Sequence, residues 1–124
     1  MPSTDAARPQ EMLTRCPAAA ETPLVSADSL AQEIGVGAVW IKDERARMGL
    51  GSFKALGAAY VVAHDASKGQ AVGRTYVTAS AGNHGMSVAA GAAAFAAHSV
   101  VYIAETVPQA FANRLTVQLS LIHI

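Results

Sequence analysis

The sequence predicts an α/β fold in which apolar strands alternate with helices around a mostly parallel sheet. Hydrophobic residues make up 52% of the 124 residues and charged residues 15%, which is typical of a globular chain. Short apolar runs recur at 38–42, 75–78 and 99–103, and a segment of helical character follows each of them. Such alternation indicates parallel strands with helical crossovers.

The first third of the chain is expected to be the least regular. Residues 1–20 combine proline, alanine and polar residues, and we expect a loosely ordered arm there. An extended segment should follow around Pro23, because the residue before a proline avoids the helical region. Asp28 can cap a short helix that ends at Gly35. The run 38–42 is predicted to be a buried strand.

The remaining elements follow in clear alternation. A helix with a broad apolar stripe should follow Ser52 and stop near Lys68. After the second strand, a turn of small residues precedes a helix predicted over 86–97. Thr106 can cap a last helix with Pro108 in its first turn. Parallel α/β sheets bind ligands where strands turn into helices, so function is expected in these turns.

Charge and cysteine content exclude several classes of function. Nine basic residues balance nine acidic ones and aromatic residues are sparse, so no nucleic-acid partner is expected. The most apolar region, 88–97, is too short to span a bilayer, and no membrane partner is expected. The one cysteine, Cys16, allows no internal disulfide and no CxxC site, and the histidines lack metal-ligand spacing. We therefore expect no metal site and a reducing, cytoplasmic location.

Lys54 has an unusual setting for a lysine. Its neighbours from Gly49 to Ala58 are small or apolar, and glycines lie on both sides. Burial disfavours the ammonium form, so a buried lysine has a lowered pKa and can form an imine with a carbonyl. The alternative is a structural lysine near a helix start that reaches water, and this stretch alone favours that alternative.

The turn from Ser80 to Gly85 suits an anion. Its small residues let the backbone approach a ligand, and the following helix directs N–H groups and its positive end toward that space. Asn83 adds a side chain that can donate and accept. A purely structural strand-to-helix turn fits the same residues equally well. Together, an amine nucleophile and an anion site suggest amino-acid chemistry, with pyridoxal phosphate as the electron sink.

The two turns resemble the motifs of fold-type II pyridoxal-phosphate enzymes. The string from Ser52 to Ala58 is similar to the family's cofactor-lysine motif, and that from Thr78 to Gly85 to its substrate-carboxylate loop. The resemblance implies a three-layer α-β-α fold with a mostly parallel sheet, and pyridoxal 5'-phosphate as cofactor. Flanking segments that also agree are Thr22-Pro23-Leu24, Ile41-Lys42-Asp43-Glu44 and Val101 to Pro108.

This resemblance implies a role for each motif residue. Lys54 would hold the cofactor covalently and, once an amino acid displaces it, remove the substrate's α-proton. Ser52 would assist proton transfer, and Phe53 and Asn83 would contact the cofactor. The implied reaction is β-elimination from a small amino acid, which releases ammonia and a keto acid, in an enzyme that is a homodimer at full length. The substrate carboxylate would be bound by Ser80, Ala81, Gly82, Asn83 and His84.

The subfamily stays open at this point. The motif around Lys54 and the charged residues before it look like diaminopropionate ammonia-lyases, whereas the loop 80–85 is nearer the threonine dehydratase and threonine synthase pattern. The ammonia-lyases usually carry an Asp, a second base, where this chain has Ala81. A β-replacement enzyme of the cysteine-synthase or threonine-synthase type and an inactive family fragment are the alternatives.

The domain organisation is also inferred from the resemblance. Residues 21–72 are expected to be the N-terminal part of the large cofactor domain, and residues 73–124 a part of the small substrate domain, cut off at its C-terminal end. The family's glycine-rich phosphate loop and the residue that meets the pyridine nitrogen lie further along than this chain reaches. We therefore expect the 124-residue chain alone to bind the cofactor poorly and to turn over little.

Overall fold

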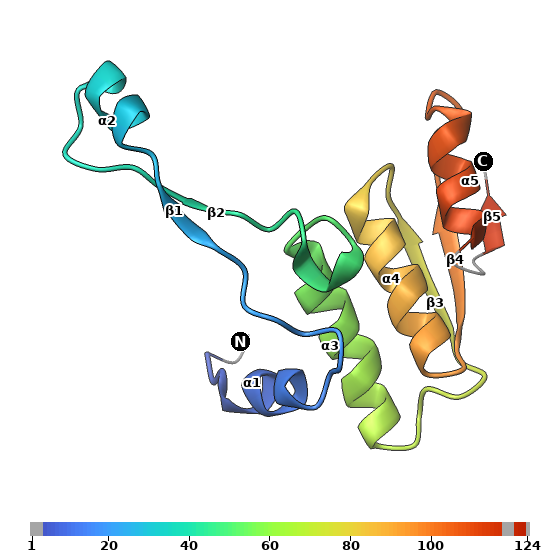
Figure 1. Cartoon of the computed structure of the whole chain (residues 1–124). Coiled ribbons are helices and arrows are strands. Elements are labelled where there is room, and N and C mark those ends of the chain that lie inside the picture. The colour runs from blue at the N-terminus through green and yellow to red at the C-terminus, as the bar shows by residue number, and fades with distance from the viewer. Residues whose placement is uncertain (1–3, 118–120, 124) are drawn as a thin grey trace.

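The molecule has an α/β body from which a hairpin unit projects (Figure 1). The computed structural model describes residues 4–117 and 121–123. Helix α1 (Ala7–Thr14) comes first. The hairpin unit consists of β1 (Leu24–Ser26), α2 (Asp28–Ile34) and β2 (Trp40–Lys42), and a 3-10 turn, Arg47–Gly49, leads out of it. The body consists of α3 (Lys54–Ser67), β3 (Thr75–Ala79), α4 (Asn83–Ala94), β4 (His98–Tyr102), α5 (Gln109–Val117) and β5 (Leu121–His123).

The sheet of the body is parallel, which confirms the predicted α/β class. β4 lies between β3 and β5, with Thr75 opposite His98 and Ala79 opposite Tyr102. One face of the sheet is covered by α4, against which Val101 is buried, whereas Val77 on the other face is 63% exposed. The described residues thus form one helical layer on the sheet, and the three-layer arrangement stays a prediction.

The core lies where α4, β4 and α5 meet. Small residues on α4 allow this close packing, because a Cβ at Gly85 would lie only 3.0 Å from Val101 Cγ1. On its other side α4 packs against α3, across the expected domain boundary between residues 72 and 73, which remains a prediction. Among the described helices, none has the length and apolar character to cross a bilayer. The buried core residues are Met86, Ala89, Val101, Ile103, Ala112 and Leu115.

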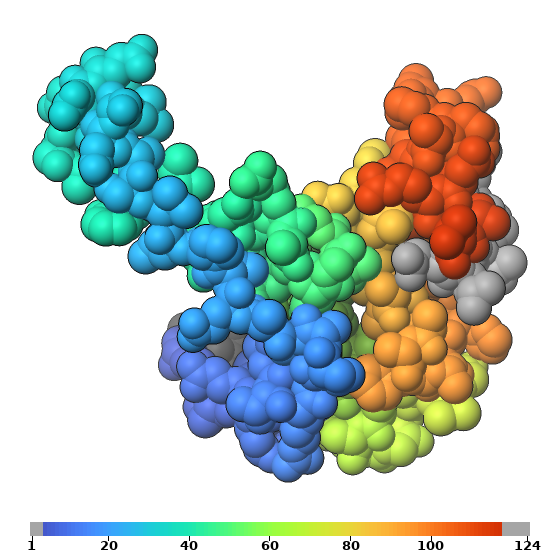
Figure 2. Space-filling model, in the orientation of Figure 1, coloured from blue at the N-terminus to red at the C-terminus, as the bar shows by residue number. Residues whose placement is uncertain are grey.

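The hairpin unit differs from the prediction for residues 38–42. β2 pairs antiparallel with β1, Leu24 opposite Lys42, and both strands are exposed rather than buried. Trp40 is 62% exposed, because a two-stranded ribbon of three-residue strands offers no second layer to cover it. The predicted helix between them is confirmed, and it ends at Gly35 with a left-handed φ of 72°. Figure 2 shows how far this unit extends from the rest of the surface.

Residues 1–20 contain a helix where the sequence predicts a loosely ordered arm. The Asp5 carboxylate accepts a hydrogen bond from the Ala7 N–H (2.9 Å) at the start of α1. An ion pair between Glu11 and Arg15 (2.6 Å) bridges one turn. The proline-rich composition concealed this helix, because Pro9 lies in the first turn, where proline is tolerated.

Candidate functional site

The loop before α3 places Lys54 as the first residue of that helix. Gly49 and Gly51 have positive φ values of 69° and 78°, so the chain turns through a conformation that favours glycine. The Ser52 hydroxyl then accepts a hydrogen bond from the Lys54 N–H (3.3 Å). Ser52, Phe53 and Lys54 are therefore presented together where the helix begins.

Lys54 is exposed in the structure, at the start of a helix, as expected of the alternative in which the lysine reaches water rather than of a buried lysine. The reason is helical periodicity. Ala55, Ala58 and Val62 form the buried face of α3, at spacings of three and four residues, and Lys54 lies off this face. These three residues are buried, whereas the Lys54 amine stays accessible to solvent.

Ser80 organises the second motif. Its backbone N–H donates to the Tyr102 carbonyl (3.0 Å), which holds it at the carboxyl end of the sheet. Its hydroxyl accepts hydrogen bonds from the N–H groups of Gly82 (3.2 Å) and Gly85 (3.1 Å). This capping starts α4 at Asn83, three residues earlier than predicted.

Asn83 and His84 consequently lie in the first turn of α4 rather than in the turn before it. The first N–H groups of a helix have no intrahelical acceptor, and they carry the positive end of the helix dipole. The segment from Ser80 to His84 thus presents backbone donors suited to a carboxylate.

A cavity of about 510 Å³ joins the two motifs. Ser52 and Phe53 line it from the first motif and Asn83 from the second, so three predicted site residues meet there. As the structure describes the cavity, Lys54, Ser80, Ala81, Gly82 and His84 are not in its lining. The remaining wall comes from the hairpin unit and the loop after it: Val25, Ile41, Lys42, Asp43, Glu44, Arg45 and Gly51.

Two carboxylates in this wall are ion-paired. Asp43 accepts from Arg45 Nε (2.9 Å) and Nη2 (2.6 Å), and these bonds lower the pKa of Asp43 to about 2. Glu44 accepts from Arg47 (2.7 Å) and from the Thr22 hydroxyl, which in that order lower the pKa of Glu44 to about 2. Sequence reasoning noted these residues only as a family resemblance and missed their place in the cavity wall.

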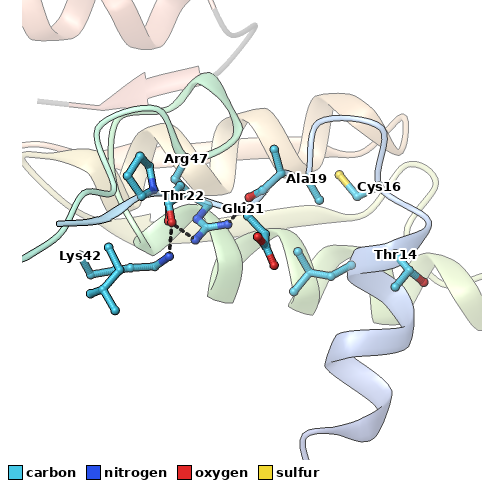
Figure 3. Close-up of a pocket in the computed structure, with 11 residues that line it drawn as sticks. Thr14, Cys16, Ala19, Glu21, Thr22, Lys42 and Arg47 are labelled. Atoms are coloured by element: carbon cyan, nitrogen blue, oxygen red, sulfur yellow. Dashed lines mark hydrogen bonds between the residues drawn. The ribbon is translucent and has the colours of Figure 1, made fainter.

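A larger cavity, of about 810 Å³, lies between α1 and the segment leading into β1 (Figure 3). Arg47 donates there to the Ala20 carbonyl (2.7 Å) and the Thr22 hydroxyl (2.7 Å), and Lys42 donates to the Thr22 carbonyl. These contacts fasten the chain before β1. Neither motif contributes to the lining, so the chemistry favours the smaller cavity as the site.

A family model matches this chain over residues 16–119, under the description "Pyridoxal-phosphate dependent enzyme". The chain belongs to the pyridoxal-phosphate-dependent enzyme family. Both motifs and the smaller cavity lie within the matched range. The cofactor of this family is pyridoxal 5'-phosphate.

Curated relatives of this pyridoxal-phosphate enzyme chain are named diaminopropionate ammonia-lyase. The protein of Escherichia coli (strain K12) is 35% identical over an alignment of 98 residues, and the match covers 66% of this chain and 25% of the relative. The protein of Salmonella typhimurium is 33% identical over an alignment of 109 residues, and the match covers 72% of this chain and 27% of the relative. The chain thus spans about a quarter of the relatives' length.

Solved structures agree with the family fold. Diaminopropionate ammonia lyase from Escherichia coli, in complex with an aminoacrylate-PLP azomethine reaction intermediate, matches 94% of this chain and 33% of its own with TM-score 0.84 and 27% identity. The processed form of threonine deaminase isoform 2 from Solanum lycopersicum matches 98% of this chain and 34% of its own with TM-score 0.72. At 23% identity, the second match supports the fold alone.

The residues of this site fit the family's cofactor. An accessible primary amine begins α3, and the adjacent cavity has a volume within the ~300–1,000 Å³ typical of small-molecule sites. Phe53 is 62% exposed, so its ring is available to pack against a bound group. In the part of the chain that the structure describes, no cluster of His, Cys, Asp and Glu offers a metal site.

Proposed function

We propose that this chain carries the reactive lysine and the substrate loop of a lyase that releases ammonia and a keto acid from a small amino acid by β-elimination. The observation that carries the proposal is the cavity in which Ser52 and Phe53, next to Lys54, face Asn83 at the start of α4. Relatives above 30% identity named as ammonia-lyases support the reaction type.

Each residue has a distinct task in this reaction. Lys54 Nζ holds the cofactor covalently and, once free, accepts the substrate's α-proton as general base. The first N–H groups of α4 bind and orient the substrate carboxylate, in a loop that the Ser80 hydroxyl keeps in place. Ser52 stands beside the lysine and would assist proton transfer, and the Asn83 amide, which lines the cavity, would help to hold the cofactor. Bound pyridoxal phosphate supplies the electron sink that makes the α-proton acidic.

The activity is proposed for a protein that combines this chain with the rest of its relatives' length. In that protein residues 21–72 belong to the cofactor domain and residues 73–124 to the substrate domain. Further residues complete a three-layer fold, and two copies form a homodimer in the cytoplasm. The exposed sheet face around Val77 supports a missing layer.

Lysine trapping tests the site in the 124-residue chain. The chain has three lysines, and incubation with pyridoxal phosphate followed by borohydride reduction labels those that form an imine. We expect Lys54 to be labelled fastest by peptide mass mapping. Lys68, which lies outside the cavity lining, serves as the internal control, and Lys42 compares a second lysine of the cavity wall that already donates to the Thr22 carbonyl. Equal labelling of all three lysines would contradict the assignment.

Product analysis tests the reaction in the longer protein. We expect release of ammonia and keto acid from at least one of serine, threonine and diaminopropionate, and loss of this release in Lys54→Ala. Formation of a substituted amino acid when a thiol is added, without keto acid, would indicate a β-replacement enzyme. No release from any of the three would contradict the lyase assignment.

A further inference from the structure

An ion pair that the proposed mechanism does not use borders the smaller cavity. Asp43 and Arg45 follow β2, and both line the cavity together with Ser52, Phe53 and Asn83. The guanidinium of Arg45 meets both oxygens of the Asp43 carboxylate. A charged group in this position can discriminate between bound amino acids by the charge of their side chains.

The other charged side chains in this wall are engaged elsewhere. Glu44 is bound by Arg47 and Thr22, and its pairing with Arg47 leaves both side chains largely buried, at 16% and 11% exposed. Lys42 donates to the Thr22 carbonyl. The second motif, residues 78–85, contains no acidic residue. Asp43 is therefore the carboxylate of this site that remains for a ligand.

The partner of Asp43 is easily exchanged. The Arg45 side chain is 89% exposed, whereas the Asp43 side chain is 23% exposed. An ion pair with so exposed a member contributes little net stability, so another cation can replace the guanidinium. The carboxylate itself stays oriented, because its Oδ1 also accepts from the Arg45 backbone N–H (3.1 Å) and the Asp43 N–H donates to the Pro23 carbonyl (2.9 Å).

We infer that Asp43 is a specificity-determining residue that favours amino acids whose side chain carries a cationic amino group. The substrate's side-chain ammonium takes the place of the Arg45 guanidinium on the carboxylate, and Arg45 moves into solvent. A neutral hydroxyl side chain gains less, because its hydrogen bond to the carboxylate lacks the Coulomb attraction between an ammonium and a carboxylate. The inference rests on the proposed function, since it assumes that an amino acid occupies this cavity.

Amide chemical shifts of the ¹⁵N-labelled chain measure the selectivity without any turnover. Titrations with 2,3-diaminopropionate and with serine give one affinity for a cationic side chain and one for a neutral side chain. We expect Asp43→Asn to weaken diaminopropionate binding about tenfold and to leave serine within about twofold. Arg45→Ala should strengthen diaminopropionate binding severalfold, because it removes the competing cation. Glu33→Gln, an exposed carboxylate on α2, is the matched control and should change neither affinity.

Several results would overturn the inference. They are an unchanged diaminopropionate affinity in Asp43→Asn, an equal loss for both amino acids, and no binding of diaminopropionate by the parent chain. If circular dichroism shows that Asp43→Asn is unfolded, the Arg45→Ala variant provides the test instead. A diaminopropionate affinity that does not rise in Arg45→Ala would then contradict the inference. Selective trapping of Lys54 is measured separately, so its failure contradicts the proposed function, whereas intact trapping without Asp43-dependent selectivity contradicts only this inference.

Discussion

In the body of the molecule Leu115, Val101 and Val62 are almost fully buried, whereas in the hairpin unit Leu24 and Trp40 are 61% and 62% exposed. The two regions have similar apolar residues but different partners. Helices α4 and α5 close over the parallel sheet, while the hairpin has two short strands and one short helix, in which only Ala31 is buried. Apolar residues stabilise a region only where a second element faces them.

The smaller cavity lies between these two regions. Phe53 and Asn83 belong to the well-packed body, and Val25 and Ile41 belong to the hairpin unit. Polar contacts from Thr22, Glu44 and Arg47 hold the base of the hairpin instead of a core. The lysine that we propose as reactive thus begins a well-packed helix, whereas the wall that we propose to bind the substrate side chain belongs to a weakly packed unit.

The largest expected difference is between truncations of leucine in the two regions. Leu115→Ala should lower the free energy of unfolding by about 3 kcal/mol, because it leaves a cavity in the core. Leu24→Ala in β1 should change it by less than about 0.5 kcal/mol, because that side chain is exposed. Urea unfolding followed by circular dichroism measures both. Equal losses would mean that the hairpin shares the core's cooperativity, and the comparison would fail.

A glycine-to-alanine pair in the body should give effects of opposite sign. Gly85→Ala should destabilise by about 1–3 kcal/mol, because its Cβ would lie 3.0 Å from Val101 Cγ1 in a packed interior. Gly57→Ala in α3 meets no atom within 4 Å and should stabilise by up to about 1 kcal/mol through helix propensity. Thermal melts of the two variants make the test. A stabilising Gly85→Ala would show that α4 can move away from β4 at no cost.

The smallest effect is expected at the base of the hairpin, and it depends on pH. The pKa of Glu44 is lowered from 4.5 to about 2, so its pairing stabilises the fold above pH 4.5 and is lost as the pH falls toward 2. Trp40 is the single tryptophan of the chain, and its fluorescence reports on the hairpin. We expect its signal to change across this window while the circular dichroism of the body changes less.

Glu44→Gln provides the check on that titration. It should shift the Trp40 signal at pH 7 toward the parent's low-pH value and flatten the change below pH 4.5. Asp43 titrates in the same window, with its pKa lowered to about 2, so Asp43→Asn is measured in parallel. If the full Trp40 fluorescence transition persists in Glu44→Gln and disappears in Asp43→Asn, the transition belongs to Asp43. That result would contradict the assignment to Glu44.

The body could be predicted because its pattern is local. Strand-length apolar runs separated by helical stripes define β3, α4, β4 and α5, and the place of Asn83 follows from where the parallel strand β3 ends. Ser52 and Phe53 instead follow the antiparallel ribbon, and the parallel pattern does not predict their meeting with Asn83. Burial and exposure of Lys54 both stay open in the sequence, because a helix separates its apolar neighbours onto different faces. The early start of α4 depends on the Ser80 hydroxyl, and the exposed hairpin depends on which elements are present to cover it.

Strands β1 and β2 form a ribbon of only two strands, so each has a free edge among the described residues, and apolar side chains lie beside it. Such edges can pair with strands of other molecules. Lys42 is the one charged residue in these two strands, and among the described residues no helix covers their edges. The solution behaviour of this chain should therefore depend on concentration. Light scattering should detect reversible self-association that rises with protein concentration and weakens in Ile41→Lys. The concentration at which self-association begins is the upper limit at which the unfolding curves can be recorded.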